Sequence, residues 1–194
     1  MSKRILVLNG HPDPAPERLC AALAEAYAQG AAAAGHEIRR IDIGSLEFPF
    51  LGSAQEFATP PDLPAIQHAQ DAVRWAEHLV FVYPLWLGSQ PAKLKGFLEQ
   101  IARGGFALSV NADTTRVKGL LGGRSAHLFV TMGMPGLVYR VVYGAFGVRA
   151  LEVSVLQLCG VRPVRHNFFG MVEPSARRRQ KWLAKMKRLG AGAA

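Results

Sequence analysis

Short apolar runs along the chain alternate with stretches in which apolar residues recur at helical spacing. Runs rich in Val, Leu, Ile and Phe occupy residues 4–8, 79–84 and 125–132. After the second run, Leu94, Phe97, Leu98 and Ile101 recur every three or four residues. Short apolar runs bounded by turn residues indicate buried strands, and the longer spacing indicates amphipathic helices. The alternation predicts an α/β protein whose parallel sheet is covered by helices on both faces.

The Pro and Gly residues between these stretches predict where the helices begin and end. We expect the first helix to start near Pro16, which presets the first helical turn, and to end at Gly35. The last helix should run from about Pro174, with residues 190–194 as a frayed tail. The polar stretch 104–123 exceeds an ordinary connection, so it is a candidate lid or oligomer contact.

Length and composition predict one domain over residues 1–194, with 49% hydrophobic residues to fill a single core. No apolar stretch reaches the ~20 residues that span a bilayer, and the N-terminus lacks a signal-peptide pattern. We therefore expect a cytoplasmic protein with no membrane insertion. Cys20 and Cys159 lie in apolar helical surroundings, which indicates reduced core thiols.

The formal net charge of +9 raises the question of a nucleic-acid partner. The densest basic cluster, residues 177–188, predicts a solvated face of the last helix and matches no nucleic-acid-binding motif. We therefore expect no nucleic acid, and favour attraction of anionic nucleotides or phosphorylated cofactors. The six histidines are scattered without metal-ligand spacing, so no metal site is predicted.

Three turns follow predicted parallel strands, at residues 10–18, 84–90 and 131–136. Ligands of open α/β sheets bind outside the carboxyl ends of the strands, so these turns should converge on one site. The turn at residues 10–18 leads into a helix whose N-terminal N–H groups favour a phosphate. His11 and Arg18 could add charge-assisted hydrogen bonds there.

Common catalytic signatures are missing from the sequence. There is no G-x-S-x-G elbow, no G-x-x-x-x-G-K-[ST] loop and no G-x-G-x-x-G fingerprint. Hydrolases, nucleoside triphosphatases and ordinary dinucleotide domains are therefore disfavoured.

Four segments carry a resemblance to a known family: ILVLNGHPDP, YPLWLGSQPAKLKGFLEQ, GGFAL and TMGMPGLVYR. Together they resemble the flavodoxin-like NAD(P)H:quinone oxidoreductases of the DT-diaphorase type, including bacterial members. The resemblance implies a doubly wound five-stranded parallel sheet in the order 2-1-3-4-5, with helices on both faces. It also implies a flavin, either FMN or FAD, with NAD(P)H as co-substrate and ping-pong hydride transfer to a quinone or similar flat electrophile.

The resemblance assigns the flavin phosphate to the first turn and the ring to the other two. We expect Pro84, Leu85 and Trp86 to form an apolar wall, and Gly88 to permit close backbone approach. The N–H groups of Trp86, Leu87 and Gly88 would remain free for the ring. The residues expected at its pyrimidine end are Thr131, Met132, Gly133 and Met134.

Tyr139 falls where the family places a tyrosine that assists hydride transfer, so the resemblance makes it the candidate catalytic residue. The chain departs from the family at Phe146, near the place of a partner histidine, and at Arg18 in the first turn. The family also implies a homodimer, with residues 104–123 or 137–147 completing the partner's pocket.

Two other functions remain open at this stage. A flavin-binding regulatory protein, such as an ancillary partner of a membrane transporter, is favoured by the basic charge and the missing histidine. A one-electron carrier is disfavoured, because carriers of that kind tend to be acidic.

Overall fold

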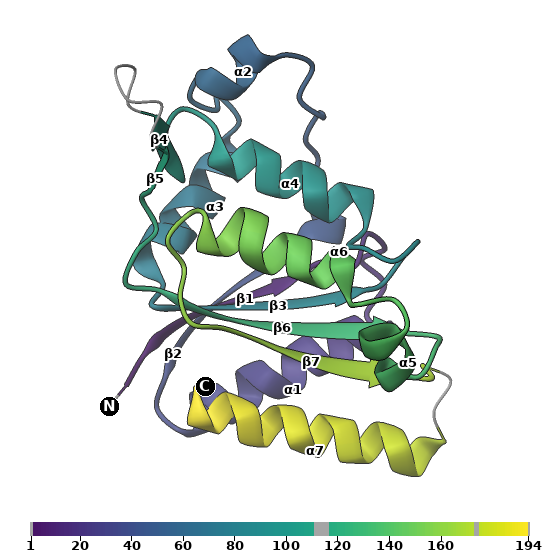
Figure 1. Cartoon of the computed structure of the whole chain (residues 1–194). Helices are drawn as coiled ribbons and strands as arrows, with labels where there is room; N and C mark the ends of the chain where they lie inside the picture. The colour runs from purple at the N-terminus through teal and green to yellow at the C-terminus, as the bar shows by residue number, and fades with distance from the viewer. Residues whose placement is uncertain (1, 111–116, 173–174, 194) are drawn as a thin grey trace.

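A single parallel sheet forms the centre of the computed structural model, which describes residues 2–110, 117–172 and 175–193 (Figure 1). Its strand order is β2-β1-β3-β6-β7, which is 2-1-3-4-5 when the sheet strands alone are counted. The predicted fold class and strand order are therefore confirmed. The strands are β1 (Arg4–Asn9), β2 (Glu37–Asp42), β3 (His78–Pro84), β6 (Ser125–Met132) and β7 (Val164–Gly170).

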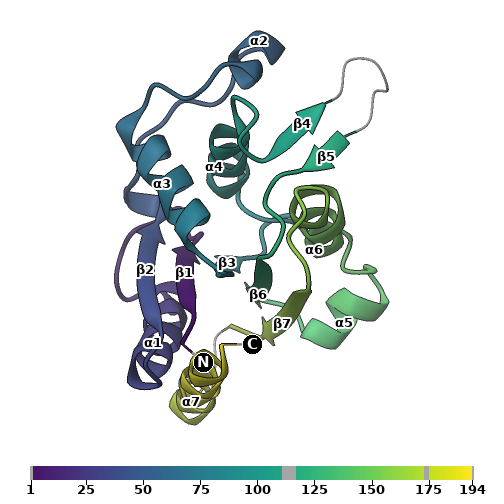
Figure 2. The ribbon, with the colours of Figure 1, turned by 90° about the vertical axis from the view of Figure 1, so that its left-hand side faces the viewer.

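Helices cover the sheet on both faces (Figures 1 and 2). Side chains alternate across a strand, so Leu6 and Leu8 join the core on one face, whereas Ile5 and Val7 join the core on the other. The second face is covered by α1 (Leu19–Ala33) and α7 (Ala176–Gly192). The first face is covered by α3 (Pro64–Trp75), α4 (Ala92–Ala102) and α6 (Phe146–Arg149), which continues as a π-helix over Ala150–Gln157.

The remaining elements lie outside the two main layers. They are the 3-10 helix η1 (Ile43–Ser45), which follows β2, together with α2 (Ala54–Ala58), α5 (Gly136–Val141) and the antiparallel pair β4 (Leu108–Val110) and β5 (Val117–Gly119). The stretch 104–123 thus contains a β-hairpin where a polar loop was expected. The lid predicted there depends partly on residues 111–116, which lie outside the described residues.

Two helix boundaries differ from the sequence prediction. The first helix begins at Leu19, three residues after Pro16, because the intervening residues form a turn closed by the Arg18 N–H donating to the Ala15 carbonyl at 3.1 Å. At the other end of the chain, α7 continues to Gly192, where fraying was expected. Ala193 is buried, and its carbonyl accepts a 2.8 Å hydrogen bond from Lys3 Nζ.

The helices α1 and α7 pack with their backbones in close contact. A Cβ placed on Gly30 would lie 2.0 Å from the Lys187 carbonyl oxygen, and one on Gly190 would lie 2.1 Å from the Tyr27 carbonyl oxygen. Glycine is disfavoured inside helices, so its presence on both helices at this contact reflects the close approach.

Gly30→Ala should therefore destabilise the protein by about 3 kcal/mol, because the added methyl group must push the two backbones apart. Helix propensity alone predicts the opposite sign, a gain of about 1 kcal/mol. Urea unfolding measures the difference. Gly192→Ala is the matched control, because a Cβ there has no neighbour within 4 Å. Equal stability of the Gly30→Ala variant and the parent would contradict this packing.

Candidate functional site

The three turns predicted from the sequence meet at the carboxyl edge of the sheet. The Gly10 N–H donates to the Val82 carbonyl at 2.8 Å, which joins the first turn (residues 10–18) to β3. The Leu85 N–H donates to the Thr131 carbonyl at 2.7 Å, which joins the second turn (residues 84–90) to the end of β6. The third turn (residues 131–136) follows directly. The turns therefore lie side by side, as the parallel sheet requires.

Side-chain hydrogen bonds fold the first turn. Asn9 is buried, accepts from the His11 N–H at 3.3 Å and donates to Asp42 at 3.0 Å. The Asp13 N–H donates to His11 Nδ1 at 3.1 Å, and the Ala15 N–H donates to the Asp13 carboxylate at 2.9 Å. Burial lowers the pKa of His11, opposed by the hydrogen bond between His11 Nδ1 and the Asp13 backbone carbonyl, at 3.1 Å, and by the charge of Asp13. The imidazole is therefore neutral at pH 7.

Arg18 points toward its own turn. Its Nε donates to the Asp13 carboxylate at 2.7 Å, and the two side chains form an ion pair. The phosphate contact predicted for Arg18 would have to share this guanidinium with Asp13. Arg18, the N-cap residue of α1, makes no capping hydrogen bond through its side chain. The first N–H groups of that helix are thus the donors that this turn offers to an anion.

The second turn is a tight reversal that exposes two apolar side chains. Trp86 and Ser89 exchange backbone hydrogen bonds of 2.9 and 3.0 Å, and between them Leu87 and Gly88 have φ of 48° and 80°. Two central residues with positive φ form a type I′ turn. Trp86 is 50% exposed and Leu87 is fully exposed. The ring of His11 lies edge-on to Trp86, with their centroids 6.0 Å apart.

Two details of the second turn differ from the sequence prediction. The Trp86 N–H is used by the Ser89 carbonyl, so it is not free for a ligand. Pro84 is buried as the last residue of β3 and forms no open wall. Gly88 has a positive φ of 80°, and a Cβ on it would have no neighbour within 4 Å among the described residues, so the space beside it is open. Within the described residues, no backbone hydrogen bond uses the N–H of Leu87 or Gly88.

The third turn offers backbone groups and few side chains. Thr131 and Met132 are buried, whereas Gly133 is exposed and Met134 is half-buried. No backbone bond of the described residues uses the N–H of Gly133 or Met134. These two are therefore the third-turn residues whose backbone is open to a ligand, whereas the side chains of Thr131 and Met132 belong to the core.

Cys20 lies behind the third turn, with its sulfur 3.4 Å from Thr131 Oγ1. Burial raises the pKa of its thiol to about 12, and the hydrogen bond with Thr131 only partly opposes this shift. A thiol needs a lowered pKa and exposure to react, so Cys20 is a core residue. Cys159 is also buried and free, as predicted.

Tyr139, the predicted catalytic residue, is buried beneath the second turn. Its side chain is only 2% exposed, and its hydroxyl donates to the Gly88 carbonyl at 2.8 Å. Burial raises its pKa, opposed by the backbone N–H groups of Val148 and Gly147 beside the hydroxyl. The hydroxyl proton of Tyr139 is thus used in a hydrogen bond within the chain. Because this bond holds the Gly88 carbonyl, Tyr139 positions the 86–89 turn.

Asp13 and Gly147 contribute to the site and were not singled out from the sequence. Asp13 contacts His11 and Arg18 at once, and an acidic residue between two prolines is a turn signal that could have revealed it. Gly147 lies directly against the second turn, because a Cβ on it would be 2.0 Å from the Gly88 carbonyl oxygen. Only tertiary packing reveals that contact.

Two other kinds of site can be tested on the described residues. Over residues 2–110, 117–172 and 175–193, no three His, Cys, Asp or Glu side chains gather where they could hold a metal ion. In the same ranges, no helix has both the length and the apolar character needed to cross a bilayer.

The fold and this edge define a protein of the flavodoxin-like class. Residues 3–189 match the family described as having a flavodoxin-like fold, so the chain belongs to that family. It is 30% identical over 131 residues to an uncharacterised NAD(P)H oxidoreductase of Haemophilus influenzae, covering 63% of this chain and 61% of the relative. It is 24% identical over 155 residues to a ribosyldihydronicotinamide dehydrogenase-like protein of Penicillium crustosum, covering 67% of this chain and 57% of the relative.

The chain thus spans about three fifths of the length of these curated relatives. Among solved structures, it resembles the NAD(P)H:quinone oxidoreductase of Methanothermobacter marburgensis, with a TM-score of 0.81 over the whole of both chains. Their sequences are 22% identical, so this likeness supports the fold alone.

Tyr139→Phe should lower the free energy of unfolding by about 1 kcal/mol, because it removes the hydrogen bond to the Gly88 carbonyl. Chemical denaturation measures this loss.

Tyr27→Phe is the matched control for this prediction. The Tyr27 hydroxyl is buried without a hydrogen-bond partner among the described residues, so its removal should leave stability unchanged or slightly increased. Equal effects of the two substitutions would contradict a positioning role for the Tyr139 hydroxyl.

Proposed function

We propose that this protein is a flavin-dependent NAD(P)H oxidoreductase that reduces quinones or similar flat electrophiles. The observation that carries the proposal is the group of unused backbone N–H donors at the sheet edge. Leu87 and Gly88 present theirs from the second turn, and Gly133 and Met134 from the third. An uncapped helix N-terminus lies beside them. A planar, hydrogen-bonding ring attached to a phosphate requires this combination of donors.

The residues present fit a flavin. The N-terminus of α1 would hold the phosphate, and both FMN and FAD carry a phosphate that this turn can recognise, so the proposal extends to either. The exposed faces of Trp86 and Leu87 would border the ring. When bound, the flavin would supply two-electron hydride chemistry between NAD(P)H and an acceptor.

The chain's own groups would act mainly through the backbone. Fixed N–H donors stabilise negative charge that develops on a ring without needing to reorganise. Tyr139 holds Gly88 in place from below, and Gly147 abuts the same carbonyl group. His11, next to Trp86, stays neutral at pH 7 because burial lowers its pKa, so it can accept or donate a hydrogen bond without adding charge.

The names of the relatives support the reaction class. The Haemophilus protein is named an NAD(P)H oxidoreductase, and the Methanothermobacter protein an NAD(P)H:quinone oxidoreductase. Each name belongs to that protein, and its transfer to this chain is part of the proposal. We also place the protein in the cytoplasm, supported by the free thiols of Cys20 and Cys159, which a reducing compartment preserves.

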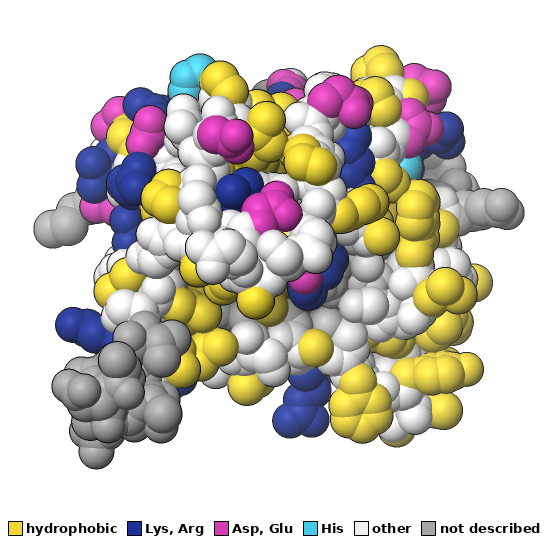
Figure 3. Space-filling view, turned by 90° about the horizontal axis from the view of Figure 1, so that it is seen from above, with side chains coloured by type: hydrophobic (Ala, Val, Ile, Leu, Met, Phe, Trp, Pro, Cys, Tyr) yellow, Lys and Arg dark blue, Asp and Glu magenta, His cyan; other side chains and the backbone are white. Residues whose placement is uncertain are grey.

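The proposal includes a homodimer formed through an exposed apolar patch. We define the α5 patch as Leu137, Val141, Val142, Tyr143 and Phe146, each 54–72% exposed. Hydrophobic side chains gather at the end of the molecule where α5 lies (Figure 3). Apolar patches of this kind mark protein–protein contacts. The patch lies on both sides of Tyr139 in the chain, so a second copy docked there would form part of the site's surroundings.

Light scattering of the purified chain should therefore give twice the 21.0 kDa chain mass. Val142→Glu should shift the protein toward monomer, because it buries a charge in the contact. Phe57→Glu, at an exposed position on α2 and outside the two candidate contact segments, is the control and should leave the mass unchanged. A monomeric parent protein at micromolar concentration would overturn the dimer.

The function itself is tested with purified protein mixed with flavin. It should oxidise NADPH in the presence of menadione faster than free flavin does. Gly88→Val should abolish flavin retention and turnover, because its side chain would enter the space assigned to the ring.

Gly123→Val is the matched control. Like Gly88, Gly123 has a positive φ, of 81°, and a Cβ on it would have no neighbour within 4 Å among the described residues. Unlike Gly88, it precedes β6 and so lies at the opposite edge of the sheet. Both variants carry the strain of a valine with positive φ. The flavin site is therefore supported only if Gly88→Val loses flavin retention and turnover while Gly123→Val keeps both. Turnover no greater than that of free flavin would favour the regulatory role instead.

A further inference from the structure

The last helix carries a row of basic side chains that form no ion pair with any acidic residue in the described part of the chain. It contains seven Lys and Arg and no Asp or Glu between Ala176 and Gly192. None of the seven forms an ion pair with a described residue. The seven are Arg177, Arg178, Arg179, Lys181, Lys185, Lys187 and Arg188.

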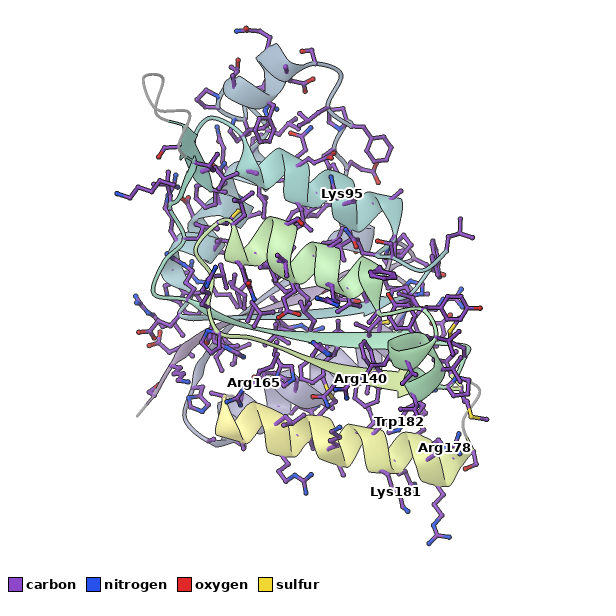
Figure 4. All side chains as sticks on the ribbon, viewed as in Figure 1. Lys95, Arg140, Arg165, Arg178, Lys181 and Trp182 are labelled. Atoms are coloured by element: carbon purple, nitrogen blue, oxygen red, sulfur yellow. The ribbon has the colours of Figure 1, made fainter. Side chains whose placement is uncertain are left out.

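Three exposed cations form a line along one side of α7. At about 100° per residue, Arg177, Lys181 and Arg188 fall on one side of the helix, opposite the buried Met186 and Gly190. We name these three residues the α7 basic stripe. Lys185 is excluded from it, because its ammonium group lies over the ring of Phe169, 5.7 Å from the centroid. Eleven residues of helix separate its ends, a length of about 16 Å. Figure 4 shows Lys181 extending away from the sheet, whereas Trp182 lies on the sheet side of α7.

Electrostatics within the helix disfavour this arrangement. Arg177, Arg178 and Arg179 occupy the first turn, where the positive end of the helix dipole prefers acidic side chains. Helix stability therefore does not account for Arg177, the first member of the stripe, or for its two neighbours Arg178 and Arg179. Residues that oppose local stability are concentrated at functional sites. The stripe therefore indicates an anionic partner.

We propose that the α7 basic stripe is a docking surface for an anionic lipid bilayer. The stripe is straight and lies on the convex surface of a helix, which suits a planar array of headgroups. Single-stranded nucleic acid requires exposed aromatic side chains on which bases stack. Trp182, the aromatic residue of α7, is half-buried with its ring edge-on to Phe169 at 5.3 Å, so it is not available for stacking.

The surface is separate from the proposed flavin site and does not depend on it. The stripe belongs to α7, which covers the sheet together with α1, whereas the open donors belong to turns beyond β3 and β6. Arg140 of α5 and Arg165 of β7 add further positive charge on the side of the molecule shown in Figure 4. Docking through the stripe would hold the enzyme at a membrane without inserting any segment of it.

The test is co-sedimentation of the full-length chain with vesicles. The protein should bind vesicles of mixed phosphatidylcholine and phosphatidylglycerol, and release as salt is raised, because screening shortens the reach of the charges. It should not bind vesicles of phosphatidylcholine alone. The double variant Arg177→Gln, Lys181→Gln should partition about 25-fold more weakly, since each basic residue near the surface contributes about a factor of five.

The control is the double variant Lys95→Gln, Lys118→Gln. It removes the same amount of positive charge, from α4 and β5, and should partition onto vesicles like the parent. All four positions are exposed, and thermal unfolding checks that the variants fold. Equal losses in the two double variants, or no preference of the parent for anionic vesicles, would overturn the proposal. Binding of a DNA duplex at least as tight as binding to vesicles, at the same salt, would also overturn it, in favour of a nucleic-acid partner.

Discussion

The hydrogen bond from the Tyr139 hydroxyl to the Gly88 carbonyl holds the candidate site together. The second turn leaves the end of β3 with two consecutive residues at positive φ, and one of them, Leu87, is not a glycine. Such a turn needs support from its surroundings to persist. Tyr139 provides the support from α5 and Gly147 from α6, so two segments far from β3 in sequence determine where the backbone donors of Leu87 and Gly88 point.

The sheet and the positions of the three turns could be predicted because they depend on local patterns. Apolar runs such as residues 79–84 can only be central strands in a domain of this size, and parallel strands place their following turns at one edge. The resemblance supplied the strand order, which the structure confirms. The cores on the two faces also follow from the alternation of side chains in β1.

The finer features of the site depend on contacts between distant segments, which a pattern does not encode. Trp86 was expected to offer its N–H, but the type I′ turn uses that group internally. Arg18 was assigned to a phosphate, whereas it pairs with Asp13 five residues earlier. Tyr139 was assigned to catalysis through the resemblance alone, and its burial in the structure gives its hydroxyl a structural partner. In each case a side chain or N–H found a partner inside the chain.

The proposed ligands and partners occupy separate surfaces of the molecule. The proposed flavin lies at the open donors of the second and third turns, the proposed second copy at the α5 patch, and the proposed bilayer at the α7 basic stripe. The most direct test of the central claim is nuclear magnetic resonance of the isotope-labelled chain during titration with FMN. The account predicts that the amide signals of Leu87, Gly88, Gly133 and Met134 shift together with those at the start of α1. Unchanged amide signals at the carboxyl edge of the sheet would contradict it.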